Sequence, residues 1–380
     1  MTVRVNKPAF NIREKLSELE RPIGLKGSEL MKSETVQEAR DFISAGRKNI
    51  LINGDFRIAQ RGTSSNSMAG NVYATVDRFF SYTANTNGTV TQTQDDDTPF
   101  GIGYSFKFES SNTGSPTNTS YYGIQQRVEG NHCADAIVYG STVSFWVKSN
   151  KSGLFPIAVF QNDSNNVTTR YSTQAYVNGN GTWQYITKYI PPGPAANNPR
   201  NDNAASYYFD ISMQAGSAYA FTSGQLNNWV QSGSVAGPNF GLCESNGNYI
   251  QFAMIQVEVG KNATDFEYRP YGEELALCQR YCQSFDGRVA IGNWNNGTSA
   301  LVVRYLNPPM RIAPSIYSYT AGRCLVEAIA WYSVGSVSIQ GETTNTSVVF
   351  QLNSISNSGQ GANANAMWGN GASVVLQAEL

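Results

Sequence analysis

Charged residues are scarce in this sequence. Asp, Glu, Lys and Arg make up 14% of its 380 residues, and the formal net charge is −1. Such a chain has no basic field to hold a nucleic acid, and no acidic tail stands out. A nucleic-acid partner is therefore not expected. The apolar share of 41% is high enough for packed cores, which argues against disorder outside the loops.

Long hydrophobic runs are also missing. No stretch approaches the roughly 20 apolar residues that a membrane-spanning helix needs, so no membrane span is expected. The N-terminal sequence MTVRVNKPAFNIREKL has no apolar run behind its basic residues, unlike a signal peptide. We therefore expect synthesis in a cytoplasm, which leaves the final location open.

Histidine and cysteine, the usual zinc ligands, are few. His132 is the only histidine, and the cysteines are Cys133, Cys243, Cys278, Cys282 and Cys324. An odd, scattered set of cysteines is not a disulfide framework. Cys278 and Cys282 stand four residues apart in a helical pattern, but zinc usually takes four ligands. Buried, reduced thiols are the better interpretation.

The sequence shows no catalytic constellation. A Ser-His-Asp arrangement would have to use His132, and no Gly-x-Ser-x-Gly elbow is present. Cys133 pairs poorly with its neighbour His132, because adjacent residues on a strand point to opposite faces. Phosphate-loop and dinucleotide fingerprints are absent as well. The run Asp95–Asp97 indicates a solvated turn, with calcium as the weaker alternative. We expect a binding or structural role and no enzymatic activity.

Residues 1–48 have the pattern of short helices. Two narrow apolar stripes are formed by Ile12, Leu16 and Leu19 and by Val36, Ala39 and Ile43. Thr35 and Glu38 make a capping box before the second stripe. Helices this short are not stable alone in water, so the stripes need a partner surface. That surface is either the chain's own body or another subunit, and we expect these six residues to dock on another subunit.

Residues 49–271 change to short alternating runs separated by turns rich in Gly, Asn and Ser. Apolar and polar residues alternate over 143–148, which predicts a half-buried strand. The apolar phase shifts between Met254 and Ile255, which predicts a β-bulge. Residues 191–205 are expected to form a long exposed loop. Many strands with little helical periodicity predict a mainly β fold, namely a jelly roll or β-sandwich domain.

Residues 272–380 begin with a predicted helix and continue as strands. Glu273 and Glu274 favour the positive end of the helix. Its apolar stripe consists of Leu275, Cys278, Cys282 and Phe285. Strands are predicted at 300–305, 316–319, 334–339, 348–352 and 374–378. The pattern predicts a second, smaller C-terminal β domain.

Aromatic residues make up 12% of the chain, and several stand in or beside turns rich in Gly and Asn. Ligand sites commonly combine aromatic walls with a few polar side chains, and sugar sites follow this rule. The candidates for glycan contact are Tyr121, Tyr122, Trp183, Tyr207 and Trp229. The alternative is packing in the core or in a subunit interface, and Trp146 and Trp183 are both expected to bury at least one face.

Several segments together resemble a known group of proteins. The opening NILINGDFRIAQRG (49–62), followed by SFWVK (144–148) and GTW (181–183), is similar to the carbohydrate-binding-module-like sandwich of bacteriophage tail proteins. QVEVG (256–260) and ATDFEYRPY (263–271) resemble its closing strand. Typical of the same group are EELALCQRY (273–281), PMRIAP (309–314) and QAEL (377–380). The pieces NKPAFNIR (6–13), GSEL (27–30) and TVQEAR (35–40) resemble the head segment of tail-fibre-like proteins of marine phages.

The resemblance implies a structural protein of the virion, located in the tail as a fibre, spike or minor component and made in the host cytoplasm. The N-terminal helices would attach to another tail protein, such as an adaptor, nozzle or hub. Homotrimers are common in the group. Host lipopolysaccharide or another surface glycan is the implied ligand.

Related sugar-binding sandwiches often hold a structural calcium near the first and last strands. Asp55 and Glu258 stand at comparable places, although calcium takes six to eight oxygen ligands. Two other functions stay open. One is an adaptor or decoration subunit without glycan binding, since fold does not fix function. The other is a glycan-degrading tail enzyme, for which no pair of spaced acids can be named.

Overall fold

The fold is that of a computed structural model, which describes residues 49–66, 71–84, 88–114, 117–219, 225–231, 237–296, 298–327, 330–356 and 364–380. These residues belong to one compact unit, Asn49–Leu380. The helices and the six docking residues expected in residues 1–48 lie outside the described part of the chain. Among the described residues, no helix is long and apolar enough to span a bilayer.

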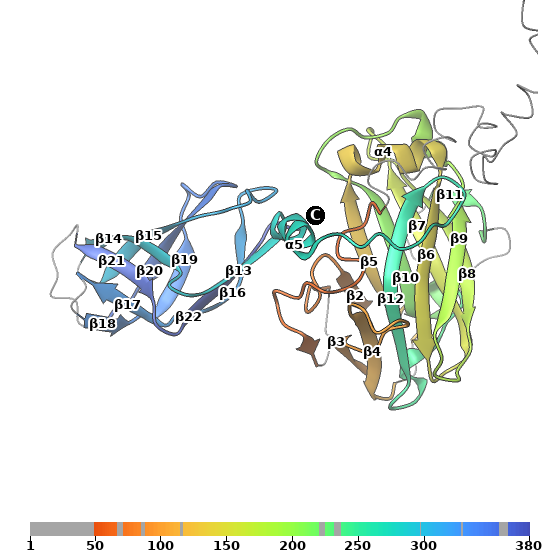
Figure 1. Cartoon of the computed structure of the whole chain (residues 1–380), viewed down its shortest axis with the longest axis horizontal. Coiled ribbons are helices and arrows are strands. Elements are labelled where there is room, and N and C mark those ends of the chain that lie inside the picture. The colour runs from red at the N-terminus through yellow and green to blue at the C-terminus, as the bar shows by residue number, and fades with distance from the viewer. Residues whose placement is uncertain are drawn as a thin grey trace, which may run out of the picture. The chain divides into compact units, whose positions relative to one another are not determined.

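The mainly β prediction is confirmed, because two antiparallel six-stranded sheets form a sandwich (Figure 1). In spatial order, the first sheet consists of β1 (Ser64–Ser65), β3 (Thr89–Asp95), β4 (Ser105–Asn112), β12 (Tyr249–Val259), β6 (Ser141–Ser149) and β9 (Gln184–Ile190). The second sheet consists of β11 (Trp229–Val230), β8 (Thr168–Val177), β7 (Gly153–Asn162), β10 (Ala205–Ala215), β5 (Tyr121–Glu129) and β2 (Phe80–Ala84).

Alternation along the strands builds the core between these two sheets. On β6, Phe145 and its neighbours two residues away are fully buried, while Trp146 belongs to the opposite phase. Phenylalanines from five strands belong to this core, and the rings of Phe106 and Phe108 have centroids 4.3 Å apart. Burying each such side chain contributes about 1.5–3 kcal/mol, so this cluster supplies much of the stability of the sandwich.

The predicted bulge lies in β12. Its register with β6 shifts between Ala253 and Gln256, and Met254 has a positive φ of 53°. Opposite the bulge, the amide of Ile255 donates to the carbonyl oxygen of Gly54 at 2.9 Å. A Cβ atom on Gly54 would lie 2.1 Å from the Ile255 oxygen, so the turn requires glycine at this position.

Two local predictions for the sandwich need correction. The helix α4 (Gly130–Tyr139) directly follows β5, where no helix was expected. Its buried residues Cys133, Ala136 and Ile137 have helical spacing, a signal too short to stand out beside the strands. Residues 191–205 are not uniformly exposed, because they contain the short helix η1 (Pro194–Asn197), whose Ala195 is buried in the core.

The helix after the sandwich is shorter than predicted. It forms α5 (Tyr271–Gln279), with Glu273 and Glu274 in its first turn as expected. Cys282 and Phe285 were assigned to its apolar stripe but lie in β13 (Cys282–Gly287). This strand pairs with β22 along all six residues, and sheet pairing overrides the local helical pattern. All five cysteines are free and buried.

The C-terminal residues form two further antiparallel sheets around a core of their own. The three-stranded sheet contains β13, β22 (Ala372–Gln377) and β16 (Ser315–Thr320). The seven-stranded sheet contains, in order, β18 (Ala330–Ser333), β17 (Arg323–Val326), β21 (Asn365–Gly369), β14 (Ala290–Asn296), β15 (Ser299–Tyr305), β20 (Ser347–Asn353) and β19 (Ser336–Ile339). All five strands predicted here are present, with shifts of one or two residues at their ends.

The last residues of the chain connect the two β parts. The Glu379 carboxylate pairs with Arg61 at 3.0 Å and also with Arg78, and both guanidinium groups are buried. The carbonyl oxygen of Leu380 accepts a hydrogen bond from Arg127 of the sandwich at 2.6 Å. The buried Glu379 carboxylate therefore helps to hold the end of the chain on the sandwich.

Replacing Glu379 with alanine should destabilise the protein strongly. The change would remove the carboxylate paired with buried Arg78 and leave buried Arg61 with only the longer contact to Asp77 at 3.8 Å; breaking comparable buried pairs costs about 3–5 kcal/mol. Urea unfolding of the full chain measures the loss. Glu342→Ala, at an exposed position, is the matched control and should leave the free energy of unfolding unchanged. Equal stability of the two variants would show that the ion pairs contribute nothing.

Candidate functional site

An exposed group of aromatic side chains lies on the outer face of the first sheet. Trp146 on β6 and Tyr185 on β9 are cross-strand partners, with ring centroids 5.3 Å apart. Phe100, in the turn after β3, stands edge-on to Trp146 at 5.2 Å. Trp183 lies immediately before β9. We call Phe100, Trp146, Trp183 and Tyr185 the aromatic platform.

Strand register brings the platform together. The phase that buries Phe145 turns Trp146 to the outer face. On its other side, Trp146 is paired with Ala253 of β12, whose small side chain leaves room for the indole. Phe100 and Tyr185 are 60% and 46% exposed, respectively, so the platform offers aromatic surface to solvent.

Charged and polar groups border the platform. The Asp97 carboxylate pairs with the Lys148 ammonium and accepts a hydrogen bond from Trp183 Nε1 at 3.2 Å. The Lys148 ammonium also lies 5.1 Å from the centroid of the Trp183 ring. Partial burial lowers the pKa of Lys148, and the nearby charge of Asp95 opposes this shift.

The Asp97 backbone is held in place by neighbouring side chains. Its carbonyl oxygen accepts hydrogen bonds from Ser105 Oγ at 2.7 Å and from Gln251 Nε2 at 3.2 Å. Its amide donates to the Asp95 carboxylate at 2.9 Å, as in an Asx turn. The acidic run therefore forms a turn that presents Asp97 beside the platform.

This arrangement is suited to binding a polar molecule that has apolar faces. Aromatic rings supply large contact areas at little conformational cost, and the charged pair supplies both donors and acceptors. A saccharide combines C–H faces with hydroxyl groups and so matches both features. Among the described residues, no group of three or more His, Cys, Asp or Glu is placed to hold a metal ion.

Of the five aromatic candidates named from the sequence, Trp183 belongs to the platform. Tyr122 and Tyr207 are 1% and 0% exposed and lie in the sandwich core. The Tyr207 hydroxyl shares a hydrogen bond with Ser141 Oγ at 2.8 Å, and burial raises the pKa of Tyr207. Their strand phase points inward, so neither ring is accessible to a glycan.

The remaining two candidates pack on the second sheet. Tyr121 contacts the rings of Tyr82 and Tyr219. Trp229 contacts the ring of Tyr171 at 5.5 Å and donates from Nε1 to the Pro191 carbonyl at 3.1 Å. Neither residue joins Trp183, because they belong to the other sheet.

The residues nominated for calcium do not fit a metal site. The Asp55 carboxylate forms an ion pair with Arg57. Glu258 accepts hydrogen bonds from the amide and hydroxyl of Thr264 at 2.7 and 2.8 Å and from Gln256 at 3.1 Å. Both carboxylates are thus engaged by donors of the chain itself, whereas calcium requires six to eight oxygens directed at one point.

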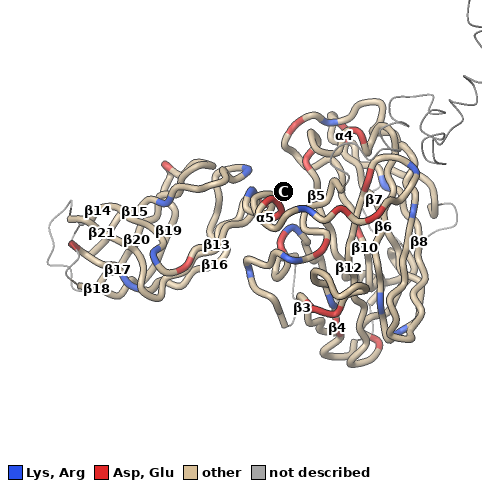
Figure 2. Tube along the Cα trace, viewed as in Figure 1, with Lys and Arg blue, Asp and Glu red and all other residues tan. Residues whose placement is uncertain are grey.

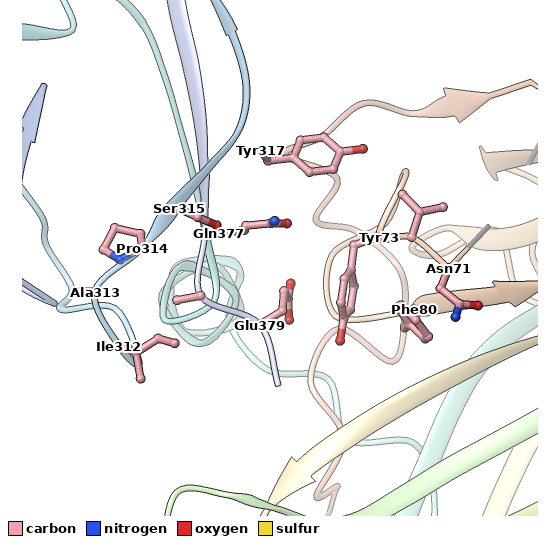
Figure 3. Close-up of a pocket in the computed structure, with 12 residues that line it drawn as sticks. Asn71, Tyr73, Phe80, Ile312, Ala313, Pro314, Ser315, Tyr317, Gln377 and Glu379 are labelled. Carbon is pink, nitrogen blue, oxygen red and sulfur yellow. The ribbon is translucent and has the colours of Figure 1, made fainter. Parts of the chain in front are cut away.

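A cavity of about 430 Å³ lies beside the C-terminal strand, lined by rings that include Tyr73, Phe80 and Tyr317 (Figure 3). Glu379 is the only charged residue among the described residues that line it. Since both Glu379 oxygens are paired with buried arginines, this cavity offers no free charge to a ligand.

Comparison with known proteins gives no match by sequence and low similarity by structure. No protein-family model matches the sequence, and no curated protein matches it. The enzymatically active domain of tailspike protein 4 of bacteriophage CBA120 is similar in structure, with 12% identity, a TM-score of 0.28 and coverage of 56% of this chain. The match spans only 21% of that tailspike chain.

Two carbohydrate-binding modules are similar over nearly their whole length. The family 11 module of a Clostridium thermocellum cellulosomal cellulase has 12% identity and a TM-score of 0.29, covering 53% of this chain and 98% of the module. The xylan-binding domain CBM22-1 of Paenibacillus barcinonensis Xyn10C has 10% identity and a TM-score of 0.29, covering 58% and 100%. Because the sequence identities and TM-scores are this low, the candidate site is assigned from the side chains of this chain alone.

A buried acid lies on the second sheet, away from the platform. Asp210 on β10 is fully buried and accepts hydrogen bonds from the Tyr82 hydroxyl at 2.5 Å and from Gln125 Nε2 at 3.2 Å. Burial raises the pKa of Asp210 to about 7, although these hydrogen bonds and the charge of Arg170 act in the opposite direction.

The stability of the protein should decline between about pH 4 and pH 7 partly because of Asp210. Its folded pKa of about 7 lies above its ordinary value of 3.8, so the folded state favours the protonated carboxyl. Between these two pH values the carboxyl is ionised in the unfolded chain but still mostly protonated in the folded one, and the free energy of unfolding falls. Asp210→Asn should make the decline in thermal midpoint shallower. Asp135→Asn, at an exposed position, serves as the control. Identical pH profiles for Asp210→Asn and the natural chain would contradict the assignment.

Proposed function

We propose that this chain is a structural protein of a bacteriophage tail and that its β-sandwich binds a host surface glycan through the aromatic platform. The observation that carries the glycan role is the exposure of adjacent aromatic rings beside a charged pair on one sheet face. The tail location is supported by the resemblance of segments 49–62 and 263–271 to tail proteins. In this proposal the chain works as a homotrimer attached through residues 1–48.

Solvent exposure of the platform has an energetic cost that a ligand would remove. Apolar surface left in water forgoes about 25 cal/mol for each Å² that could be buried. Clustered apolar groups that stay exposed commonly mark binding surfaces. Phe100 is 60% exposed in a turn between Pro99 and Gly101. Contact with a ligand would bury this ring.

The geometry favours an extended saccharide over a single sugar. Phe100 and Tyr185 both contact Trp146, with centroid spacings of 5.2 and 5.3 Å, so three neighbouring rings are available to more than one sugar unit. Lys148 is paired with Asp97, and Asp95 and Asp96 stand in the same turn, so the rim offers no unpaired positive charge that would select an anion. A neutral stretch of lipopolysaccharide or another host polysaccharide fits these features.

In this proposal the platform binds the glycan without cleaving it. Glycosidases hold two carboxylates on opposite sides of the scissile bond. The described acids beside the platform, Asp95 to Asp97, are adjacent in a single turn, and the Asp97 carboxylate is engaged by Lys148 and Trp183. Release of reducing sugar from host polysaccharide would overturn this part of the proposal.

Tyr185→Ala should weaken binding to host polysaccharide by about tenfold or more, equivalent to about 1.4 kcal/mol, because one wall of the platform is lost. Binding is measured on an array of host lipopolysaccharides and polysaccharides. Tyr176→Ala is the matched control, since Tyr176 is 52% exposed on the other sheet and Tyr185 is 46% exposed. Equal losses in both variants would contradict the site. Silence of the natural chain on all host glycans would favour a purely structural adaptor or decoration subunit.

Deletion of residues 1–48 should leave the β structure intact but abolish incorporation into particles. The unit Asn49–Leu380 has its own cores, whereas the apolar stripes of the first 48 residues need a partner surface. Circular dichroism checks the fold, and mass spectrometry of purified particles checks incorporation. Leu16→Asp, on the stripe, should reproduce the defect, and Ser17→Asp should not. Normal incorporation of the truncated chain would reject the docking role.

A further inference from the structure

The outer face of the seven-stranded sheet carries a continuous line of apolar side chains. Six apolar residues lie in register, one on each of six neighbouring strands: Trp331, Leu325, Met367, Ile291, Val303 and Val349. We call these six residues the apolar row. Each is the cross-strand partner of the next, so the row crosses β18, β17, β21, β14, β15 and β20 without a polar interruption.

The row lies on the side of the sheet opposite its core. On β17, β14 and β15, the residues next to the row, Cys324, Ala290 and Val302, are buried in the C-terminal core. Strand alternation therefore directs the row outward. An antiparallel sheet with one face toward water normally carries polar residues on that face. The apolar row departs from this rule, although Asn293, Asn365 and Gln351 stand two positions away in the same outward phase. This departure indicates that the row is covered in the working protein.

The same face contains both projecting side chains and a hollow. Ile291 and Tyr305 are 69% and 80% exposed. A hollow of about 540 Å³ lies among them and is lined also by Val303, Leu325 and Met367. A surface that has both projecting side chains and a hollow can be complementary to the same surface of a second copy, because the projecting side chains of each copy can enter the hollow of the other.

Charge is absent from the row itself. No charged residue occurs in β14, β20 or β21, whose traces are tan in Figure 2. Arg304 of β15 is next to Val303 in the opposite strand phase, and its guanidinium lies 4.3 Å from the centroid of the Phe285 ring. Arg323 and Glu327 flank the row on or beside β17. When identical subunits meet around an axis, equivalent residues approach one another, so charges there would repel their own copies. The neutrality of the row suits such a contact.

We infer that the apolar row packs against a second copy of this chain and is a subunit interface. The inference rests on the homotrimer of the proposed function and assigns its contact surface. It does not depend on glycan binding, because the row belongs to a different sheet and a different core from the aromatic platform. The side chains that line the hollow offer a polar small molecule two amides, Asn293 and Asn365, and the Tyr305 hydroxyl, with no charged group. The surface therefore matches an apolar protein face.

The test compares the full chain with two single variants by sedimentation velocity over a range of protein concentrations. Ile291→Asp and Tyr305→Asp should each raise the dissociation constant of self-association by roughly 30-fold or more, as at interface hot spots. Tyr319→Asp is the matched control, because Tyr319 is 42% exposed on the separate three-stranded sheet. The control should sediment like the natural chain.

The two variants replace exposed side chains, so their circular dichroism spectra and thermal midpoints should equal those of the natural chain. A natural chain that sediments as a single copy at micromolar concentration would overturn both this inference and the proposed homotrimer. Self-association that is unchanged in both variants would overturn the assignment to the apolar row alone and leave the homotrimer standing. The two proposals can be tested separately. The Tyr185→Ala variant should lose glycan binding and still self-associate.

Discussion

A buried carboxylate near the end of the chain joins the C-terminal residues to the β-sandwich. Glu379 is shared by Arg61 and Arg78, two guanidinium groups that water does not reach. Burying three charged groups is costly, and the cost is offset only when all of them are in place. Arg311 adds hydrogen bonds to the carbonyls of Ala378 and Glu379 at 2.9 and 2.6 Å. The apolar cluster at this junction is small by comparison, so polar geometry defines the contact.

A second constraint acts at the start of the sandwich and reaches the candidate site. Gly54 admits the carbonyl of Ile255, and the bulge that follows Ala253 fixes the register of β12 against β6. That register places Ala253 beside Trp146 and leaves room for the indole on the outer face. A glycine in the first turn thus influences the position of an aromatic ring nearly a hundred residues later in the chain.

Sequence patterns predicted the regular elements better than they predicted the site. Alternation revealed β6 and the C-terminal strands, and a phase change revealed the bulge in β12. The helix α4 was missed because strands surround its single turn of apolar spacing. Cys282 was placed in a helix because its pairing partner lies almost a hundred residues away in β22. Local periodicity contains no information about such distant partners.

The aromatic platform illustrates the same limit. Its members come from the turn after β3, from β6 and from the start of β9, and only strand pairing unites them. Closeness to turns suggested Tyr121 and Tyr122 together, yet adjacent residues of one strand face opposite sides, and Tyr122 is in the core. Trp146 was expected to bury one face, and the alternation of β6 already indicated that its side chain belongs to the outer phase.

The two proposed surfaces reinforce each other physically. A short aromatic platform binds a flexible glycan weakly, because ordering the sugar chain and losing its free motion offset much of the contact energy. Copies joined through the apolar row would present several platforms to one host surface. Linked sites of this kind raise overall affinity by about 10²–10⁴-fold without any new contact, provided that the spacing allows simultaneous binding. Self-association would therefore decide whether a weak individual site is sufficient for stable attachment to a host.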